Sequence, residues 1–328
     1  MSNEAPGVIR GKQLWSAIRS WESLGLMVAV VVLYASLSVA SPLFFTLSNQ
    51  LAILQNAAFF GIVAFAMALV IVSGEIDISV GSQAALSSSM LGVLITNQGV
   101  SMPVAVVIVM ASAALTGTFT GVMRAYFGVP TFISTLAMYF ILRGMAQLLT
   151  RNFPFPIDRD LFFYWGSGKL FDTIPVAAIY LLLAALVVGF IARKTVFGRS
   201  VYAVGGNIKA ATLSGIAVRR VKILVMLISA LAASIAGLLQ SAQLSSGNST
   251  IAIGLEFDAI AATIIGGTAL TGGKGTVLGT AIGVVIIAAL LNGMVLLGVN
   301  PYAQQVVRGA IVLIAVVVNV WRSRRTLA

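Results

Sequence analysis

Glu75 and Asp77 are two acids in the sequence SGEIDISVGS, at the end of a long apolar segment. Paired carboxylates perform general acid–base catalysis in hydrolases, but they need a cleft that admits a substrate. Two acids at the edge of an apolar segment offer no such cleft, which argues against a hydrolase. Two interpretations stay open: Asp77 or Ser79 caps the helix that follows, or the turn from Glu75 to Gly81 packs at an inner gate.

The glycine-rich segment GGTALTGGKGT around Lys274 invites comparison with a phosphate-binding loop. A Walker A motif needs Gly six residues before the Lys and Ser or Thr after it, whereas Thr268 and Gly275 occupy those positions. We therefore expect no ATP binding through this motif. Glycines that let helices approach and the backbone break at a membrane face explain the segment better. They are Gly266, Gly267, Gly272 and Gly273.

The chain contains no cysteine and no histidine. This excludes disulfides, thiolate nucleophiles, imidazole bases and the usual zinc ligands, so no metal site is expected. Any chemistry would have to come from carboxylates, lysine or serine, and their arrangement suggests no enzyme.

Composition defines the elements that carry these residues. With 59% hydrophobic and 9% charged residues and a mean hydropathy of +1.04, the chain has too little polar surface for a soluble globule. It is predicted to be an all-α polytopic membrane protein with one domain, residues 24–321. About ten apolar spans are expected: 24–41, 51–73, 82–96, 103–123, 130–150, 174–192, 223–244, 259–273, 276–299 and 304–321.

The basic residues predict the orientation of these spans. Residues 1–23 lack a cleavage site and read as a cytosolic tail, and residues 322–328 as a second one. Fifteen Lys and Arg then fall inside and three outside, which follows the positive-inside rule. This topology and anionic lipid explain the net charge of +11 without nucleic acid. The inner residues are Arg10, Lys12, Arg19, Arg124, Arg193, Lys194, Arg199, Lys209, Arg219, Arg220, Lys222, Lys274, Arg322, Arg324 and Arg325; the outer ones are Arg151, Arg159 and Lys169.

Charged and amide residues inside the spans are the remaining candidates. Arg143 and Arg308 are expected to bond carbonyls or a carboxylate of another helix. The amide side chains either hydrogen-bond a hydroxylated solute along a substrate path or bond other helices. The path candidates are Gln55, Asn56, Gln147 and Asn292, beside the further amides Gln240, Gln243 and Gln304.

The basic segment from Arg193 to Lys222 is the longest interruption of the apolar pattern. After the Gly205-Gly206-Asn207 turn, apolar and polar residues alternate as in a short amphipathic helix, which either enters a groove on a soluble partner or lies at the interface. A faint repeat relates residues 70–86 to residues 264–280, as in two halves of a translocation unit. The outer segment 151–173 is either an aromatic belt loop or a docking surface.

Five segments together resemble the permeases of ribose-type sugar ABC importers, in order and spacing: VIVSGEIDISVGS, PTFISTLAMYFILRGMA, FGRSVYAVGGNIKAATLSGI, LEFDAIAATIIGGTALTGGKGTVLGT and LLNGMVLLGVNPYAQQVVRGAIVL. The resemblance implies a type II, vitamin B12-importer-like fold used as a pair in the bacterial inner membrane. It also implies a cytosolic ATPase that holds ATP and Mg, and a periplasmic sugar-binding protein. The ATPase-coupling loop would comprise Gly198, Tyr202, Gly205, Gly206, Asn207, Ala210, Ala211 and Gly215.

One departure leaves the substrate open. Relatives usually read Ser-Gly-Gly-Ile-Asp where this chain has Glu75 in place of the second Gly. The expected function is import of a monosaccharide or a sugar-like solute such as rhamnose or autoinducer-2. The alternatives are a branched-chain amino-acid permease of the same type and an ion-coupled secondary transporter, which would need ionisable groups at mid-membrane.

Overall fold

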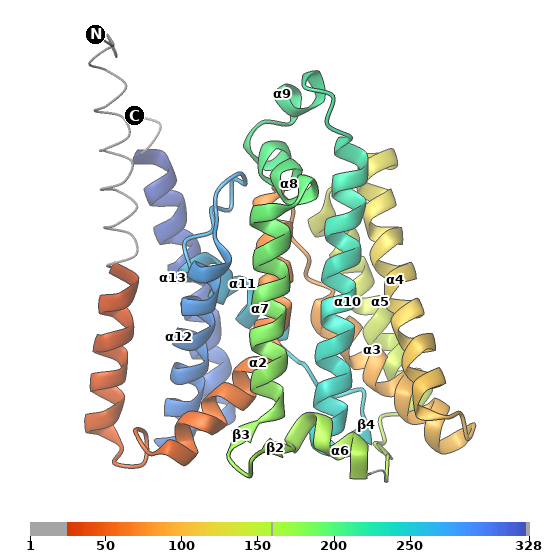
Figure 1. Ribbon diagram of the computed structural model, residues 1–328, viewed down its shortest axis with the longest axis vertical. Coiled ribbons are helices and arrows are strands. Elements are labelled where there is room, and N and C mark those ends of the chain that lie inside the picture. The colour runs from red at the N-terminus through yellow and green to blue at the C-terminus, as the bar shows by residue number, and fades with distance from the viewer. Residues whose placement is uncertain (1–24, 159, 326–328) are drawn as a thin grey trace.

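Helices that run side by side make up most of the computed structural model, which describes residues 25–158 and 160–325 (Figure 1). Within that part of the chain, seven helices are long and apolar enough to cross a membrane. They are α2 (Leu47–Val72), α4 (Met102–Phe127), α5 (Thr131–Thr150), α7 (Val176–Lys194), α10 (Val218–Leu244), α12 (Val277–Leu296) and α13 (Pro301–Arg325). The protein is a multi-pass helical membrane protein.

The other three predicted spans contain shorter helical segments, as far as the described residues go. They are the helix Gly25–Ala40, α3 (Val80–Gly92) with the π-helix η1 (Val93–Asn97), and α11 (Leu255–Ile265). α11 has 11 residues and is about 16 Å long, roughly half a bilayer core. The prediction of a helical span over 259–273 is wrong, because Gly266 and the left-handed Gly267 (φ 88°) end the helix.

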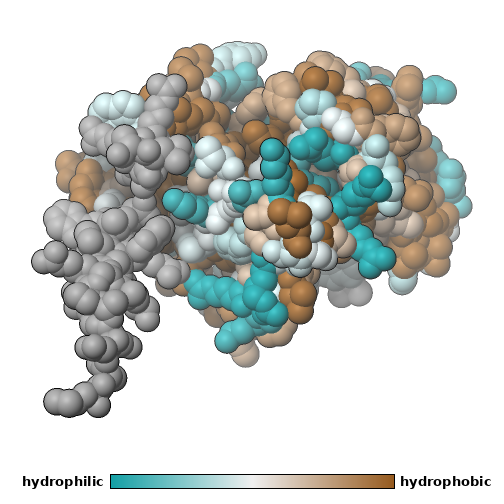
Figure 2. Space-filling model, turned by 90° about the horizontal axis from the view of Figure 1, so that it is seen from above, coloured by the Kyte–Doolittle hydropathy of each residue, from teal (hydrophilic) through white to brown (hydrophobic). Residues whose placement is uncertain are grey.

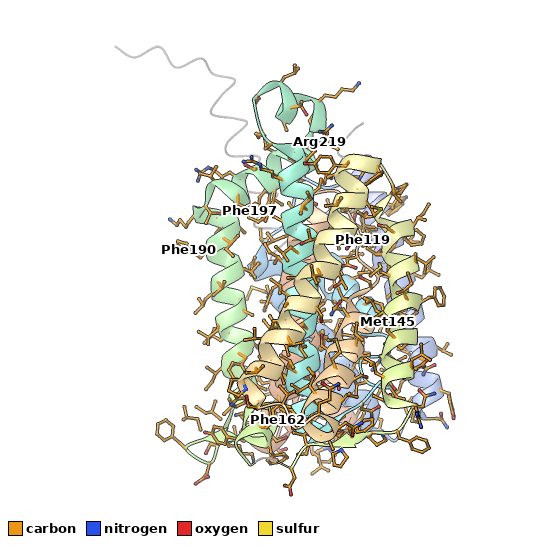
Figure 3. The ribbon with its side chains drawn as sticks, turned by 90° about the vertical axis from the view of Figure 1, so that its right-hand side faces the viewer. Phe119, Met145, Phe162, Phe190, Phe197 and Arg219 are labelled. Atoms are coloured by element: carbon orange, nitrogen blue, oxygen red, sulfur yellow. The ribbon has the colours of Figure 1, made fainter. Side chains whose placement is uncertain are left out.

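α2 lies at the centre of the bundle, and other helices surround it. In its most apolar window 89% of the residues are buried, whereas the corresponding share is 22–28% in α4, α5 and α7 and 0% in α13. Phe119, Met145 and Phe190 project outward from these peripheral helices (Figure 3). An apolar outer surface around an apolar centre is expected where lipid is the solvent.

The two ends of the bundle differ in structure and charge. One end carries α8 (Val196–Gly206) and α9 (Ile208–Leu213), and the last turn of α13 lies on the same side (Figure 1). Seen from above, polar side chains gather over this end (Figure 2). Its exposed basic residues are Arg193, Lys194, Arg199, Lys209, Arg219 and Arg220. Arg10, Lys12, Arg19 and Arg159, and residues 1–23 as a whole, lie outside the described residues.

The opposite end is a small cap. α6 (Asp160–Ser167) lies between two short antiparallel pairs (Figure 1). β1 (Phe155–Pro156) pairs with β4 (Ser246–Gly247), with Phe155 opposite Gly247, and β2 (Lys169–Leu170) pairs with β3 (Ile174–Pro175). The segment 151–173 is thus folded onto the bundle, and β4 starts the stretch that leads into α11.

Candidate functional site

An extended segment, residues 73–79, connects the end of α2 to the start of α3 inside the protein. The left-handed Gly74 (φ 79°) turns the chain out of α2. From one side, α10 holds the segment: the Lys222 ammonium donates to the Ser73 carbonyl (2.7 Å) and the Ser229 hydroxyl to Asp77 Oδ2 (2.7 Å). From the other side, the Thr131 and Thr135 hydroxyls of α5 accept the backbone N–H groups of Ile76 (3.4 Å) and Ile78 (3.2 Å).

Glu75 is the centre of a buried charge cluster in this segment. Its side chain is 4% exposed and accepts hydrogen bonds from Lys222 Nζ and Arg124 Nε (2.8 Å) at one oxygen and from the Thr131 hydroxyl (2.6 Å) at the other. The Lys222 and Arg124 charges and the Thr131 hydrogen bond offset the cost of burying this carboxylate. Glu75 therefore joins α4, α5 and α10.

The capping prediction is wrong in its detail. Ser79 is the N-cap residue of α3, but its hydroxyl makes no capping bond. It donates instead to Asp77 Oδ1 (2.6 Å), which also accepts the Ser79 backbone N–H (2.9 Å). Asp77 is 1% exposed and fixes the turn before α3 rather than the first turn of the helix.

A second non-helical segment, residues 245–254, contains β4 and several turns and leads into α11. The Arg143 guanidinium of α5 donates to the Ser249 and Ile251 carbonyls, both at 2.8 Å, as expected of a buried arginine. Next along the chain, Glu256 is 1% exposed, and neither of its carboxylate oxygens has a hydrogen-bond partner. It lies against Gly81, where a side chain would also meet the Ala252 carbonyl at 2.7 Å. The first turns of α3 and α11 therefore meet inside the bundle.

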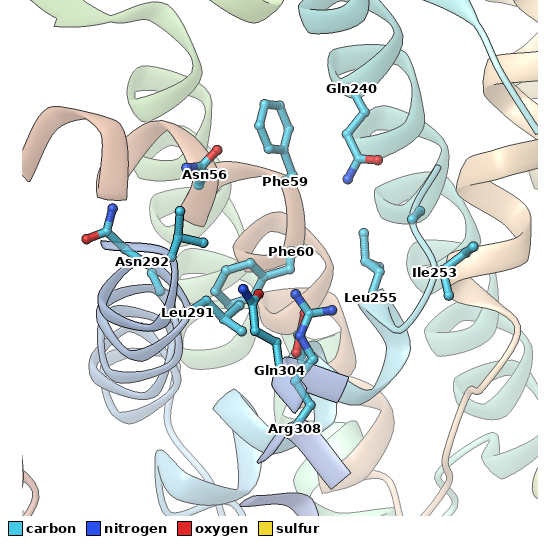
Figure 4. A pocket seen from close by; sticks show the side chains of 14 residues that line it. Asn56, Phe59, Phe60, Gln240, Ile253, Leu255, Leu291, Asn292, Gln304 and Arg308 are labelled. Atoms are coloured by element: carbon cyan, nitrogen blue, oxygen red, sulfur yellow. The ribbon is translucent and has the colours of Figure 1, made fainter. Parts of the chain in front are cut away.

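A cavity of about 360 Å³ lies beside this meeting point, between α2, α10, α12, α13 and the start of α11 (Figure 4). Asp258 of α11 and Arg308 of α13 form an ion pair at 3.6 Å on its wall. Four amide side chains from four helices also line it, namely Asn56, Gln240, Asn292 and Gln304. The remaining wall is apolar, including Phe59, Phe60 and Leu291. Such a cavity suits a small neutral solute that is rich in hydroxyl groups.

Two of the four predicted path residues line the cavity, and the other two lie elsewhere. Asn56 and Asn292 line the cavity, and Asn292 is also paired with Asn49 through two hydrogen bonds (2.9 and 3.0 Å). Gln55 points elsewhere and donates to the Gly166 carbonyl (3.2 Å), while Gln147 is exposed on α5 and is not among the lining residues. Consecutive residues on a helix face different directions, which separates Gln55 from Asn56.

The predicted coupling segment folds as two helices. Asn207 caps α9 by accepting the Ala210 N–H (3.0 Å), and the left-handed Gly215 (φ 77°) follows α9. Ala210 is exposed, whereas Ala211 is buried at 4% exposure. A side chain on Gly206 would meet open space, and one on Gly198 would meet the backbone of α7.

The glycine-rich segment 266–275 packs under α8. The Tyr202 hydroxyl donates to the Gly275 carbonyl (2.9 Å), and Gly273 N–H donates to the Val72 carbonyl at the end of α2 (2.8 Å). A side chain on Gly205 would lie 2.7 Å from Gly273 N. Three more glycines and one lysine complete this contact region: Gly266, Gly267, Gly272 and Lys274. The two segments of the faint repeat thus touch at this end, while the structural counterpart of α3 is α11.

Lys222 and Ser229 are the residues that sequence reasoning missed as part of the site. Lys222 was counted among the basic residues of a cytosolic loop, yet it is 4% exposed and lies in α10. The signal that would have found them is their spacing, because residues seven apart lie on one face of a helix. Two polar residues on one face of an apolar span indicate a buried polar partner.

Comparisons with known proteins agree with this architecture. The profile of the family described as "Branched-chain amino acid transport system / permease component" matches residues 49–316. The chain is 46% identical to the "Probable ABC transporter permease protein YphD" of Escherichia coli (strain K12), over 94% of this chain and 92% of that one. It is 40% identical to the "Ribose import permease protein RbsC" of the same strain, over 89% and 92%.

A third relative is named for another sugar. The "L-arabinose ABC transporter permease protein AraH" of Azospirillum brasilense is 34% identical over 97% of this chain and 92% of that one. No solved structure matches the chain. The match over most of the chain, together with the helical bundle around α2, confirms the resemblance seen in the sequence, and the protein belongs to the family of branched-chain amino acid transport system permease components.

Proposed function

We propose that this chain is the transmembrane permease subunit of a binding-protein-dependent ABC importer that moves a monosaccharide or sugar-like solute into the cytoplasm. The observation that carries the proposal is the cavity with four amide side chains and one ion pair on its wall. Amides donate and accept hydrogen bonds, as sugar hydroxyls require. Asp258 and Arg308 already neutralise each other, which favours a neutral solute over an amino acid.

The proposed partners follow from the two ends of the bundle. A cytosolic ATPase, which would hold ATP and Mg, would receive α9, where Leu213 is 90% exposed and Ile208 45% exposed. A periplasmic sugar-binding protein would dock on the opposite cap, and a second permease copy would complete the path. We place the protein in the bacterial inner membrane with both termini cytosolic. The resemblance supports a type II fold with ten crossings. In this fold, residues 73–79 with α3 would make one crossing, and residues 245–254 with α11 another.

The proposed transport cycle uses the contact of the glycine segment 266–275 with α8 and with the end of α2. Closure of the ATPase would displace α8 and α9, and α8 packs on the glycine segment 266–275 through Tyr202 and Gly205. We assign the inner gate to this segment and to the turn from Glu75 to Gly81, because Gly273 is hydrogen-bonded to the last turn of α2. The cavity would then be exposed alternately to the two sides.

The proposal is tested by reconstitution in proteoliposomes. The chain alone should neither hydrolyse ATP nor accumulate tritiated D-ribose, D-xylose or L-arabinose, and adding the ATPase and the binding protein should produce both activities. Ala210→Glu should lower co-purification of the ATPase about tenfold or more, since an unpaired charge in an apolar groove costs more than the roughly 1–3 kcal/mol of an unpaired neutral polar group. Ser200→Glu, on the neighbouring α8, is the matched control.

Two results would contradict this proposal. ATP turnover by the purified chain alone would place the ATPase activity here instead of in a partner. Uptake of leucine but of no sugar would favour the amino-acid alternative. Ala211 is not a suitable test position, because its side chain is buried and a charge there would damage the fold itself.

A further inference from the structure

α10 begins directly after the coupling segment. Ile216 N–H donates to the Ala211 carbonyl (3.0 Å), and Val218 N–H to the Ile216 carbonyl (2.8 Å). With Gly215 in the left-handed conformation, these bonds make a short bend between α9 and α10. Lys222 lies in the second turn of α10. A displacement of α9 therefore reaches Lys222 over a few residues.

α10 also contacts residues 73–92 along most of their length. At the cytosolic end, Lys222 binds Ser73 and Glu75. Further along, Ser229 donates to Asp77 (2.7 Å), and two serine pairs join α10 to α3: Ser87 donates to Ser234 (2.9 Å) and Ser241 to Ser88 (2.6 Å). All these groups are buried. Residues 73–79 and α3 thus form one continuous hydrogen-bonded contact with α10.

The competing contacts to α5 are weaker. α5 holds the same segment through the N–H groups of Ile76 and Ile78 at 3.4 and 3.2 Å, and both bonds are between neutral groups. The bonds from α10 are shorter and include a buried charge pair, and charge-assisted bonds are about twice as strong as neutral ones. α5 also makes one charge-assisted bond, because the buried Thr131 hydroxyl donates to Glu75 (2.6 Å); Arg124 belongs to α4. α10 makes more bonds of this kind, from Lys222 to Ser73 and Glu75 and from Ser229 to Asp77. When α10 and α5 separate, the segment should stay with α10.

We propose that Glu75 and Lys222 are positioning residues that make residues 73–92 follow α10 when the coupling segment is displaced. Through them, a movement of α9 would reach the first turn of α3, which contacts Glu256 beside the cavity. This inference rests on the proposed function, since the displacement would come from the partner ATPase. Neither residue would touch the solute.

The test removes both charges together, because a single substitution leaves one buried charge unmatched. In proteoliposomes with the ATPase and the binding protein, Glu75→Gln/Lys222→Gln should raise the ATP hydrolysed per sugar transported at least about fivefold. The sugar is whichever of tritiated D-ribose, D-xylose and L-arabinose the unmodified chain accumulates. Arg220→Gln changes an exposed residue two positions before Lys222 in α10 and should leave the ratio unchanged.

A distance measurement distinguishes linkage from simple loss of structure. The chain has no cysteine, so Leu213→Cys on α9 and Asn97→Cys after α3 can be spin-labelled selectively, with labelled chain diluted in unlabelled chain. Adding ATP and vanadate to the ATPase complex should leave this distance unchanged in the otherwise unmodified chain, because both labels move with α10. In the double variant the distance should change.

The outcomes separate the two proposals. No uptake of any sugar by the unmodified chain would overturn the proposed function. Normal uptake with an unchanged ATP-to-sugar ratio in the double variant would overturn the positioning role, as would a nucleotide-dependent distance change in the unmodified chain. If the double variant does not assemble, Lys222→Gln alone leaves Glu75 paired with Arg124 and Thr131 and should show a smaller rise in the ratio. An unchanged ratio there also overturns the role.

Discussion

The two non-helical segments, residues 73–79 and 245–254, both precede a short helix but differ in chemistry. Each leads into a short helix, α3 or α11, whose first turn meets that of the other at Gly81 and Glu256. In each, a cation from a neighbouring helix binds backbone carbonyls: Lys222 binds that of Ser73, and Arg143 binds those of Ser249 and Ile251. Inside a membrane protein, backbone carbonyls that are not bonded within a helix need such hydrogen-bond donors.

The difference lies in the carboxylates. Around residues 73–79, Glu75 and Asp77 have hydrogen-bond or ionic partners at every carboxylate oxygen. After residues 245–254, both oxygens of Glu256 lack a hydrogen-bond partner, and Asp258 pairs with Arg308 only at 3.6 Å. The first segment is therefore fixed in place by side chains of neighbouring helices, whereas the second borders the cavity. A fully paired polar cluster is rigid, whereas the longer Asp258–Arg308 pair lines the cavity and remains available to a solute.

The largest effect is expected from Glu75→Leu, which tests whether the first segment depends on its charge pair. The substitution leaves Lys222 buried without a counterion, and breaking a buried pair costs about 3–5 kcal/mol. The free energy of unfolding in mixed micelles should fall by that amount, with a matching loss of folded protein. Glu75→Gln removes the same charge but keeps an acceptor for the Thr131 hydroxyl, so it should cost somewhat less. A loss near zero for Glu75→Gln would show that the charge is unimportant.

A smaller loss is expected from Arg143→Met in the second segment. It removes two charge-assisted hydrogen bonds to buried carbonyls and an electrostatic attraction to the buried Glu256, which is not in a direct ion pair with Arg143. We therefore expect about 2–4 kcal/mol by the same measurement. Arg143→Lys keeps the charge and one donor and should recover part of the stability. If Arg143→Met cost more than Glu75→Leu, or nothing at all, the proposed ranking of the two segments would be wrong.

The smallest effect on stability is expected from Asp258→Asn at the cavity wall. The ion pair is long and Arg308 is 30% exposed, so its loss should change the unfolding free energy by about 0–1 kcal/mol. Uptake of the accepted sugar should fall about tenfold or more if the carboxylate bonds the solute, since such a bond contributes roughly 1.5–3 kcal/mol. A large loss of stability with normal uptake would assign Asp258 a purely structural role.

The sequence by itself determined the class of protein and the places where helices occur. Each predicted apolar span contains a helix, because a chain in lipid must satisfy its backbone hydrogen bonds within the helix. The Gly205-Gly206-Asn207 boundary before α9 and the left-handed Gly215 were also predictable, since they are local properties of glycine and asparagine. The five motif segments were sufficient to indicate the family.

Only the tertiary structure decided which polar residues meet. Glu75 looked like a helix-boundary acid and Lys222 like a loop cation, yet they are 147 positions apart and share one buried site. Likewise, Asn56 lies on the cavity while its neighbour Gln55 does not. Apolar residues dominate every helix, so hydrophobic periodicity carries little information about which face is turned inward. That choice depends on contacts between distant helices, which form only when the bundle packs around α2.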